Sequence, residues 1–187
     1  MTHYETYYDS PLGDMLLVAN GDALTGVYFS HQKYFPPAGD TRRDGADVAV
    51  LRDAKRQLDE YFHEGRRTFD LALAAQGTPF QQGVWAELQR IPFGETRSYG
   101  DLAHALGDLN KSRAVGAANG RNPIAIIVPC HRVIGADGTL TGYASGVERK
   151  LALLSLEGAA LAPVTGATLA ATRRTRLSAP ANLAFDF

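Results

Sequence analysis

Cysteine is almost absent from this sequence, since Cys130 is the only one in 187 residues. One thiol cannot form an internal disulfide, and the paired Cys/His spacings of a structural zinc site are missing, so no disulfide and no metal are expected. Apolar runs of about 18 residues are also missing, as is a basic N-terminus followed by an apolar stretch. We therefore expect a soluble, cytoplasmic protein with a free thiol and no membrane partner.

A large excess of charge of either sign is missing too. The net charge of -1 argues against a globally basic nucleic-acid binder, while 45% hydrophobic and 21% charged residues are typical of a globular chain. The average hides an asymmetry: residues 1–77 hold 8 basic and 12 acidic residues, residues 78–163 hold 8 and 7, and residues 164–187 hold 3 and 1. Exposed charges act over about 10 Å at moderate salt, so the second part can still meet phosphate. The charges permit DNA binding without requiring it.

The first part of the chain has the pattern of a small antiparallel sheet followed by a helix. The segments HYETYYDS, DMLLVAN and LTGVYFS predict three strands, with turn signals in SPLG and NGD between them. An apolar stripe from Val50 to Phe62 predicts a helix that Gly65 closes. TFDLALA, residues 68–74, predicts a further strand, and AAQG at 74–77 is the expected linker. Residues 1–77 are thus predicted to form an N-terminal domain.

The second part is predicted to be a mostly helical domain over residues 78–163. Thr78 and Ser98 each begin a capping box, and Asn110 is expected to cap a helix over 111–119. The turn GDLN between two short helices predicts a helix-turn-helix. IAIIV predicts a buried strand and GVERKLALLSLEG a final helix, while residues 164–187 lack periodicity and are expected to be a flexible tail. The predicted fold class is α/β, more narrowly α+β.

Cys130 lies in the segment IVPCHRV, at the end of an apolar run. A lone cysteine is most often an inert core residue, and only a few per cent of a thiol with an ordinary pKa is ionised at neutral pH. A reactive cysteine therefore needs a base or a positive charge, and His131 and Arg132 come next in the chain. Because consecutive side chains of a strand point to opposite faces, we predict a bend after Pro129 or a bridging water.

Glu157 is a candidate to orient His131. It lies in the last turn of the final helix, where the helix dipole disfavours a carboxylate by roughly a few tenths of a kcal/mol. Such an electrostatically poor position suggests another use. The alternative, a solvated surface glutamate, is equally compatible with the sequence.

The second helix of the helix-turn-helix is rich in small residues. A sequence-specific reader would present large polar side chains to the major groove, but this helix offers Ala114, Gly116, Ala117 and Ala118 after Arg113. Such a surface suits the minor groove without base-specific contacts. Packing between helices is the alternative, and on this pattern alone it is favoured.

A base inside a duplex must be flipped out before an enzyme can reach it, so an enzyme that binds DNA here and reacts through Cys130 would have to flip its target base.

These motifs resemble the O6-alkylguanine-DNA alkyltransferases, also called methylated-DNA-protein-cysteine methyltransferases, most closely the bacterial Ogt type. The resemblance rests on GTPFQQGVW, IPFGETRSYGDLA and the long stretch from RAVGAANGRNPIAIIVPCHRV to the end of the final helix. It covers residues 77–158 densely. It implies a ribonuclease-H-like N-terminal domain and a C-terminal domain that binds DNA and accepts the alkyl group.

The resemblance also implies roles for single residues. Cys130 would attack the alkyl carbon on guanine O6, His131 would take the thiol proton through water, and Glu157 would orient the imidazole. Asn122 would brace the turn beside the site, and Tyr99 would donate to the leaving guanine, whose developing charge must be neutralised. The product is a thioether, so the protein would act once and be consumed. No cofactor or metal is implied.

The implied partner is double-stranded DNA carrying O6-alkylguanine, bound through the minor groove without sequence preference by a protein that is monomeric in solution. Arg113 would replace the flipped nucleotide, and Tyr143 and Ser145 would line the alkyl pocket. The remaining DNA-binding residues would be Ser112, Ala114, Gly116 and Ala117. Activity on O4-alkylthymine and cooperation along DNA are left open. Three rivals remain: a cysteine hydrolase with multiple turnovers, a helix-turn-helix regulator with an inert thiol, and a lesion sensor that binds without transfer.

Overall fold

The computed structural model describes residues 3–37 and 42–161, so the predicted tail lies outside the described residues. Strands β1 (His3–Ser10), β2 (Gly13–Asn20) and β3 (Ala23–Phe29) form antiparallel neighbours, which confirms the three predicted strands. A fourth strand, β4 (Arg42–Asp44), pairs in parallel with β1 and gives the sheet order β3-β2-β1-β4. The sheet is therefore mixed rather than wholly antiparallel. The sequence RRD of β4 shows no apolar alternation that could have predicted it.

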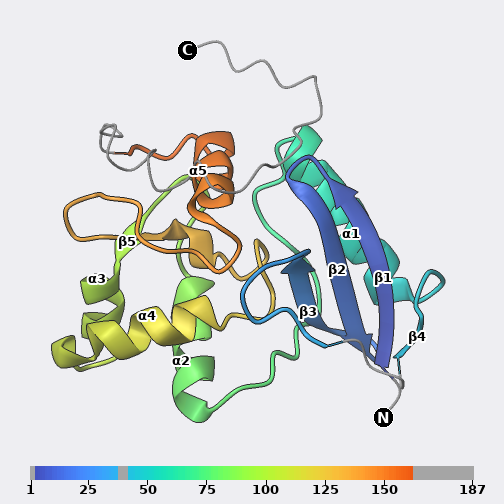
Figure 1. The fold of residues 1–187 in the computed structure, drawn as a ribbon, viewed down its shortest axis with the longest axis horizontal. Helices are drawn as coiled ribbons and strands as arrows, with labels where there is room; N and C mark the ends of the chain where they lie inside the picture. The colour runs from blue at the N-terminus through green and yellow to red at the C-terminus, as the bar shows by residue number, and fades with distance from the viewer. Residues whose placement is uncertain (1–2, 38–41, 162–187) are drawn as a thin grey trace.

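Helix α1 (Ala49–His63) packs against this sheet, as Figure 1 shows. The predicted stripe faces inward, with Leu51, Ala54 and Leu58 fully buried against the core side of β2 and β3. Gly65 has a φ of 75°, a left-handed conformation that glycine adopts without a steric penalty, and the chain leaves the helix there. The three predicted strands and the helix thus form, and the parallel strand β4 is the addition that was not predicted.

The predicted strand over residues 68–74 was wrong. In the structure this stretch meets β3 at one point only, where Leu24 and Leu73 form an isolated bridge. The amide of Leu24 donates to the carbonyl of Ala72 at 2.8 Å, and the amide of Ala74 donates to the carbonyl of Leu24 at 2.9 Å. One bridge does not extend into a ladder, so the segment is an extended connection to the second half.

The second half is mostly helical, and Figure 1 shows it beside the sheet. Its elements are α2 (Pro79–Leu88), β5 (Arg97–Ser98), α3 (Tyr99–Ala105), the 3₁₀ turn η1 (Leu109–Lys111), α4 (Ser112–Gly120), the 3₁₀ turn η2 (Cys130–Arg132), β6 (Val133–Ile134) and α5 (Val147–Leu156). Both predicted capping boxes are present, at Thr78 and Ser98. Among the described residues, no helix is long and apolar enough to cross a membrane.

The predicted cap at Asn110 was wrong. Asp108 takes the role instead, because its carboxylate accepts the amide of Asn110 at 3.0 Å and begins η1 before α4. Helices α3 and α4 pack together as the predicted helix-turn-helix, and Trp85 of α2 donates its indole N–H to the carbonyl of Ala118 at 2.9 Å. The buried side of α4 therefore packs against α2 and α3.

The predicted buried strand over residues 124–128 was also wrong. The segment is buried, but Ile126 has a φ of 69°, which breaks the pleat of a strand. Only its start pairs with the sheet: the amide of Val27 donates to the carbonyl of Pro123 at 2.8 Å, and the amide of Ala125 donates to the carbonyl of Val27 at 3.0 Å. Apolar character alone cannot separate a strand from an irregular buried segment. This contact joins the edge of the N-terminal sheet to the segment that precedes Cys130.

Candidate active site

The chain bends at Cys130, as predicted. Pro129 has a ψ of 63°, and η2 begins directly after it. Cys130 is 5% exposed, and its thiol donates a long hydrogen bond of 4.0 Å to the hydroxyl of Tyr143. His131 next to it is fully buried and bonds to Glu157 instead. The bend therefore gives the two neighbouring side chains separate partners within one site.

Glu157 binds His131 and Arg132 inside the protein. One carboxylate oxygen, Oε1, lies 2.8 Å from Nε2 of His131 and accepts Nη2 of Arg132 at 2.9 Å, while Oε2 accepts Nε of Arg132 at 2.8 Å. The carboxylate is fully buried, so the alternative of a solvated surface glutamate was wrong. The structure thus brings Cys130, His131 and Glu157 together, as the sequence predicted; their chemical roles stay predictions.

These hydrogen bonds and the burial of the site set the ionisation states of Glu157 and His131. Burial raises the pKa of Glu157, but the hydrogen bonds from His131 and Arg132 outweigh it and lower the pKa to about 2. Burial also lowers the pKa of His131. An ionised carboxylate only accepts hydrogen bonds, so the neutral imidazole carries its proton on Nε2. Its Nδ1 then keeps a free lone pair, and this atom has no hydrogen-bond partner among the described residues.

Two further groups fix the position of Glu157. Tyr61 of α1 donates its hydroxyl to Oε1 at 2.8 Å, and the amide of Gly94 donates to Oε2 at 3.2 Å. Gly94 has a φ of 78°, and a Cβ there would lie 2.8 Å from the carbonyl oxygen of Glu157, so only glycine fits. Tyr61 lies within the apolar stripe predicted from Val50 to Phe62, and that pattern does not indicate a contact with Glu157. No sequence signal links it to a residue 96 positions away.

Asn122 braces the segment that leads to Cys130. Its amide donates to the carbonyl of Val128 at 2.7 Å and to that of Ile124 at 3.3 Å, and its side-chain oxygen accepts the amide of Ile124 at 3.0 Å. These bonds satisfy backbone groups that a strand would have paired with a neighbouring strand. The position agrees with the bracing role that the resemblance implies.

The thiol has one charged neighbour that the sequence analysis missed. Burial raises the pKa of Cys130, while Asn122, Tyr143 and the charge of Lys150 act in the opposite direction. Lys150 of α5 is fully buried; it donates to the carbonyl of Thr141 at 3.1 Å, and burial lowers its pKa to about 8. A signal was present, because Lys150 lies three, four and seven residues before Leu153, Leu154 and Glu157, all on the buried face of α5.

A small pocket of about 10 Å³ lies beside Cys130. This is room for roughly one water molecule and not for a guanine. It is lined by residues of three separate segments: Gln32, Asn119, Gly120, Asn122, Ala125, Cys130, Gly142, Tyr143, Ala144 and Ser145. Tyr143 and Ser145 thus lie where the resemblance places them, although the Ser145 hydroxyl donates to Gln32 at 2.9 Å.

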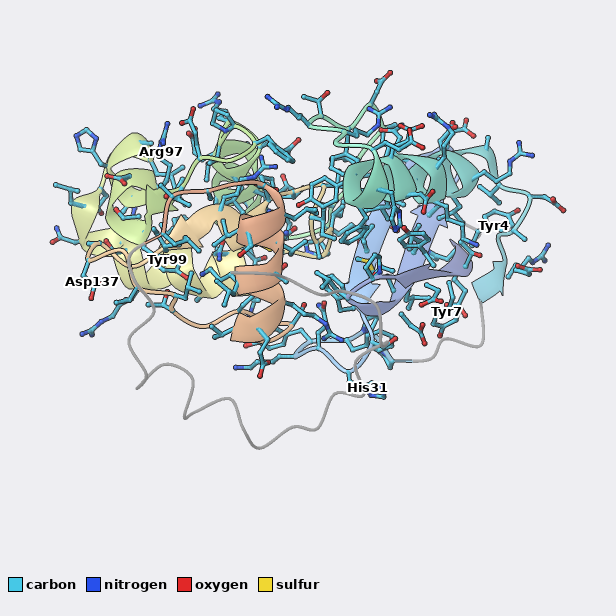
Figure 2. The ribbon with its side chains drawn as sticks, turned by 90° about the horizontal axis from the view of Figure 1, so that it is seen from above. Tyr4, Tyr7, His31, Arg97, Tyr99 and Asp137 are labelled. Atoms are coloured by element: carbon cyan, nitrogen blue, oxygen red, sulfur yellow. The ribbon has the colours of Figure 1, made fainter. Side chains whose placement is uncertain are left out.

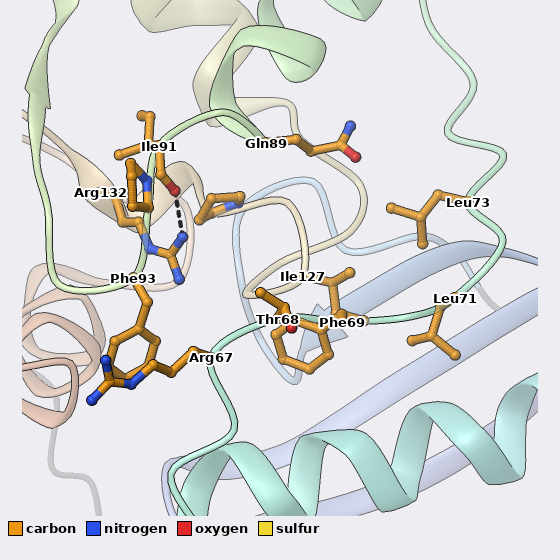
Figure 3. Close-up of a pocket in the computed structure, with 12 residues that line it drawn as sticks. Arg67, Thr68, Phe69, Leu71, Leu73, Gln89, Ile91, Phe93, Ile127 and Arg132 are labelled. Atoms are coloured by element: carbon orange, nitrogen blue, oxygen red, sulfur yellow. Dashed lines mark hydrogen bonds between the residues drawn. The ribbon is translucent and has the colours of Figure 1, made fainter.

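A larger cavity of about 500 Å³ is lined in part by Ile127, Pro129 and Arg132, which lie close to Cys130 in the chain. Figure 3 shows Arg67, Phe69, Phe93 and Arg132 around it, with Arg132 bonded to the carbonyl of Ile91. Cys130 does not line this cavity. Size alone would therefore point to the wrong place, and the chemistry marks the smaller pocket as the candidate site.

Tyr99 begins α3 and lies close to α4. It is half-buried, its hydroxyl accepts that of Thr141 at 3.1 Å, and its ring packs beside Gly116. Figure 2 shows Tyr99 within the C-terminal half. Burial raises the pKa of Tyr99, so its hydroxyl keeps its proton at neutral pH and is able to donate it in a hydrogen bond.

The outer face of α4 is formed by Arg113, Ala114 and Ala117, which are exposed, while Ser112 and Gly116 are partly buried. The expectation that Ala118 belongs to this surface was wrong, since Ala118 is buried in the core. The packing interpretation is therefore confirmed for the buried side of the helix, while the minor-groove interpretation of the exposed side stays a prediction. One side packs, and the other presents two alanines and an arginine to solvent.

Two family profiles match the chain. The profile described as "6-O-methylguanine DNA methyltransferase, DNA binding domain" matches residues 79–159, and "6-O-methylguanine DNA methyltransferase, ribonuclease-like domain" matches residues 3–75. The chain belongs to the 6-O-methylguanine DNA methyltransferase family. All the residues from Tyr99 to Glu157 described above lie in the family's DNA-binding domain, whereas Tyr61 and Gln32 lie in its ribonuclease-like domain.

Individual members of the methyltransferase family are close to this chain. The methylated-DNA--protein-cysteine methyltransferase of Methanosarcina acetivorans is 49% identical over 83% of this chain and 98% of its own length. That of Mycobacterium bovis is 50% identical over 84% of this chain and 93% of its own. The crystal structure of Mycobacterium tuberculosis OGT in complex with DNA superposes with a TM-score of 0.77 at 49% identity, covering 82% of this chain and 92% of that one. The predicted family, fold class and ribonuclease-like N-terminal half are thereby confirmed.

Proposed function

We propose that this protein repairs DNA by moving the alkyl group from O6 of guanine to its own Cys130, once per molecule. The observation that carries the proposal is the buried chain of contacts from the Cys130 segment through His131 to Glu157, in a member of a methyltransferase family. The relatives from Methanosarcina acetivorans and Mycobacterium bovis are methylated-DNA--protein-cysteine methyltransferases, and Mycobacterium tuberculosis OGT was crystallised with DNA. O6-Alkylguanine in duplex DNA is the substrate that agrees with the names of these relatives and with a nucleophilic thiol at the site.

The reaction requires a thiolate, and the site supplies a base for it. The thiol proton passes through a water molecule to Nδ1 of His131, whose lone pair is free. The imidazolium that forms is stabilised by Glu157, which already accepts its Nε2 proton. Burial opposes this charge separation, and Glu157 reduces its cost because the buried carboxylate is ionised before the proton arrives. Lys150 adds a positive charge that favours the thiolate.

The thiolate sulfur then attacks the alkyl carbon in a single displacement. The new S–C bond forms as the C–O6 bond breaks, and the electron pair stays on guanine. Tyr99 donates a hydrogen bond to the leaving guanine, which disperses this charge. A thioether remains on Cys130. Because the alkyl group stays bound to the sulfur, the protein is consumed by one transfer.

The exposed face of α4 is the proposed DNA-binding surface. Ala114 and Ala117 allow close approach to the backbone of the minor groove, and they carry no group that reads base edges. Arg113 at the start of this face would fill the space left by the flipped base. Because the thiol is 5% exposed and its pocket is smaller than a guanine, entry of the base requires the segment with Tyr143 to move outward. We further propose that the protein acts as a monomer in the cytoplasm.

Transfer is expected to stop after one methyl group per protein molecule. The measurement is the number of methyl groups moved from excess duplex DNA carrying labelled O6-methylguanine, followed over time. A plateau at one supports the proposal, because the thioether cannot be cleaved. Continued release of methyl product at a constant rate would instead support the rival cysteine hydrolase.

Arg113→Ala is expected to slow transfer from duplex DNA by about tenfold or more, while reaction with free O6-benzylguanine keeps its rate. Only duplex DNA has a base stack in which the flipped base leaves a gap for Arg113 to fill. Unstacking one base step costs roughly a few kcal/mol. Single-turnover rates on both substrates give the comparison. Arg52→Ala, an exposed arginine on α1 in the other half, is the matched control. An equal slowing on both substrates would remove the assigned role of Arg113.

A further inference from the structure

We infer that Gln32, in the N-terminal half, is a positioning residue that sets how large an alkyl group the Cys130 pocket accepts. This inference rests on the proposed function and deepens it. Gln32 is 8% exposed and lines the small pocket beside the thiol, although it belongs to the loop after β3 and not to the DNA-binding domain.

Gln32 and Lys33 of the N-terminal half bind residues 143–145 of the C-terminal half, which form one wall of the pocket. The side-chain oxygen of Gln32 accepts the hydroxyl of Ser145 at 2.9 Å, and it also accepts the amide of Phe29 at 2.9 Å. The amide of Lys33 donates to the carbonyl of Ala144 at 2.9 Å. Two consecutive residues of the wall are thus bonded to two consecutive residues of the loop.

The loop adopts an unfavourable backbone conformation to make these contacts. His31 and Tyr34 both have a φ of 64°, a left-handed conformation that residues with a Cβ seldom adopt. Such residues persist only where their surroundings hold them, and they gather at functional sites. Here the ring of Tyr34 lies under the guanidinium of Arg121 at 4.6 Å, next to Asn122. Figure 2 shows His31 near the seam between the two halves.

The contacts act on the reactive sulfur through Tyr143. Its hydroxyl lies 4.0 Å from the Cys130 sulfur, and the next two residues are the ones that the loop holds. Arg149 adds a hold on the same wall, because its Nη1 donates to the carbonyl of Ser145 at 3.1 Å and its Nε donates to that of Leu12 at 2.9 Å. The N-terminal half therefore fixes the wall opposite the sulfur from two sides.

The expected consequence is a dependence on the size of the alkyl group. The pocket as it stands is about 10 Å³, so any alkylated base must displace the wall. A benzyl group must displace it further than a methyl group, and it strains the Gln32–Ser145 and Lys33–Ala144 bonds more. Weakening these bonds therefore favours the bulky substrate over the small one. When these bonds are weakened, the wall also holds the methyl group less firmly against the sulfur, which lowers the rate of methyl transfer.

The test compares alkylation rates of Cys130 by duplex DNA carrying O6-benzylguanine and O6-methylguanine, each followed by intact-protein mass. In Gln32→Leu and in Ser145→Ala, the ratio of the benzyl to the methyl rate is expected to rise about fivefold, which corresponds to one hydrogen bond. Because the two variants remove the same bond, their combination should raise the ratio no further than the larger single effect. A merely structural role would lower both rates together and leave the ratio unchanged.

Gln57→Leu is the matched control. Gln57 is also a buried glutamine of the N-terminal half, and it exchanges two hydrogen bonds of 2.8 Å with the backbone of Asp70, away from the pocket. Its replacement should leave the ratio at the wild-type value. If Gln32→Leu fails to fold, Ser145→Ala decides the outcome alone. An unchanged ratio in the folded variants, or the same rise in Gln57→Leu, overturns the inference; a wild type that is alkylated by neither DNA overturns the proposed function as well.

Discussion

Glu157→Ala is expected to lower the free energy of unfolding by about 3–5 kcal/mol, as found when one partner of a buried ion pair is removed. The variant leaves the guanidinium of Arg132 buried without its counter-charge. It also removes the acceptor of the Tyr61 hydroxyl and of the His131 imidazole. Denaturant unfolding followed by circular dichroism measures the change. The protein should lose methyl transfer as well, because the imidazole is no longer oriented.

Glu60→Ala is the matched control for this prediction. Glu60 also binds two arginines, Arg56 and Arg66, but it lies on the outer side of α1 where water screens the charges. Its replacement should change stability far less than that of Glu157. If both variants unfold at the same denaturant concentration, the buried network does not have the stabilising role assigned to it.

The same carboxylate should leave a signature in the pH dependence of stability. The pKa of Glu157 is lowered from 4.5 to about 2 in the folded protein, so its contribution is fully present above pH 4.5 and is lost as the pH falls toward 2. In Glu157→Gln the residue no longer titrates. The difference in unfolding free energy between wild type and Glu157→Gln should therefore narrow over this range.

His131→Gln is expected to slow methyl transfer by about 10²- to 10⁴-fold at neutral pH, the usual contribution of a general base. The amide can still donate to Glu157, so the fold is kept, but it cannot accept the thiol proton. DNA affinity should be unchanged. Single-turnover rates across pH measure the effect, and the variant should recover rate as the pH rises, because hydroxide then ionises the thiol directly.

His63→Gln provides the comparison for that experiment, because His63 is exposed at the end of α1 and bonds to Asp59, away from the candidate site. It should transfer methyl groups at the wild-type rate. A His131→Gln protein that transfers as fast as His63→Gln would show that the imidazole does not take the proton.

Local sequence signals predicted the elements whose cause is local. The capping boxes at Thr78 and Ser98 depend on residues three apart, and the stripe of α1 depends on helical periodicity, so both were readable. The buried run at 124–128 was misread because its irregular path depends on the side chain of Asn122, which replaces a neighbouring strand. Strand β4 depends on pairing with β1, which its own three residues do not indicate.

The candidate site divides in the same way. Cys130, His131 and Glu157 were found because a lone thiol, an adjacent base and a badly placed carboxylate are unusual in themselves. Lys150 could have been found from its position on the buried face of α5. Tyr61 and Gln32 could not, because they reach the site from the N-terminal half, 96 and 113 residues from the partners they bind. Only the packing of the two halves reveals them.

Peptide mass spectrometry after incubation with duplex DNA containing O6-methylguanine tests the central claim most directly. The account predicts one added methyl group on the peptide that contains Cys130, in an amount equal to the methyl lost from the DNA, and no methyl on any peptide of Cys130→Ala. Loss of methyl from the DNA without a change in the mass of that peptide, or methylation of another residue, would contradict it.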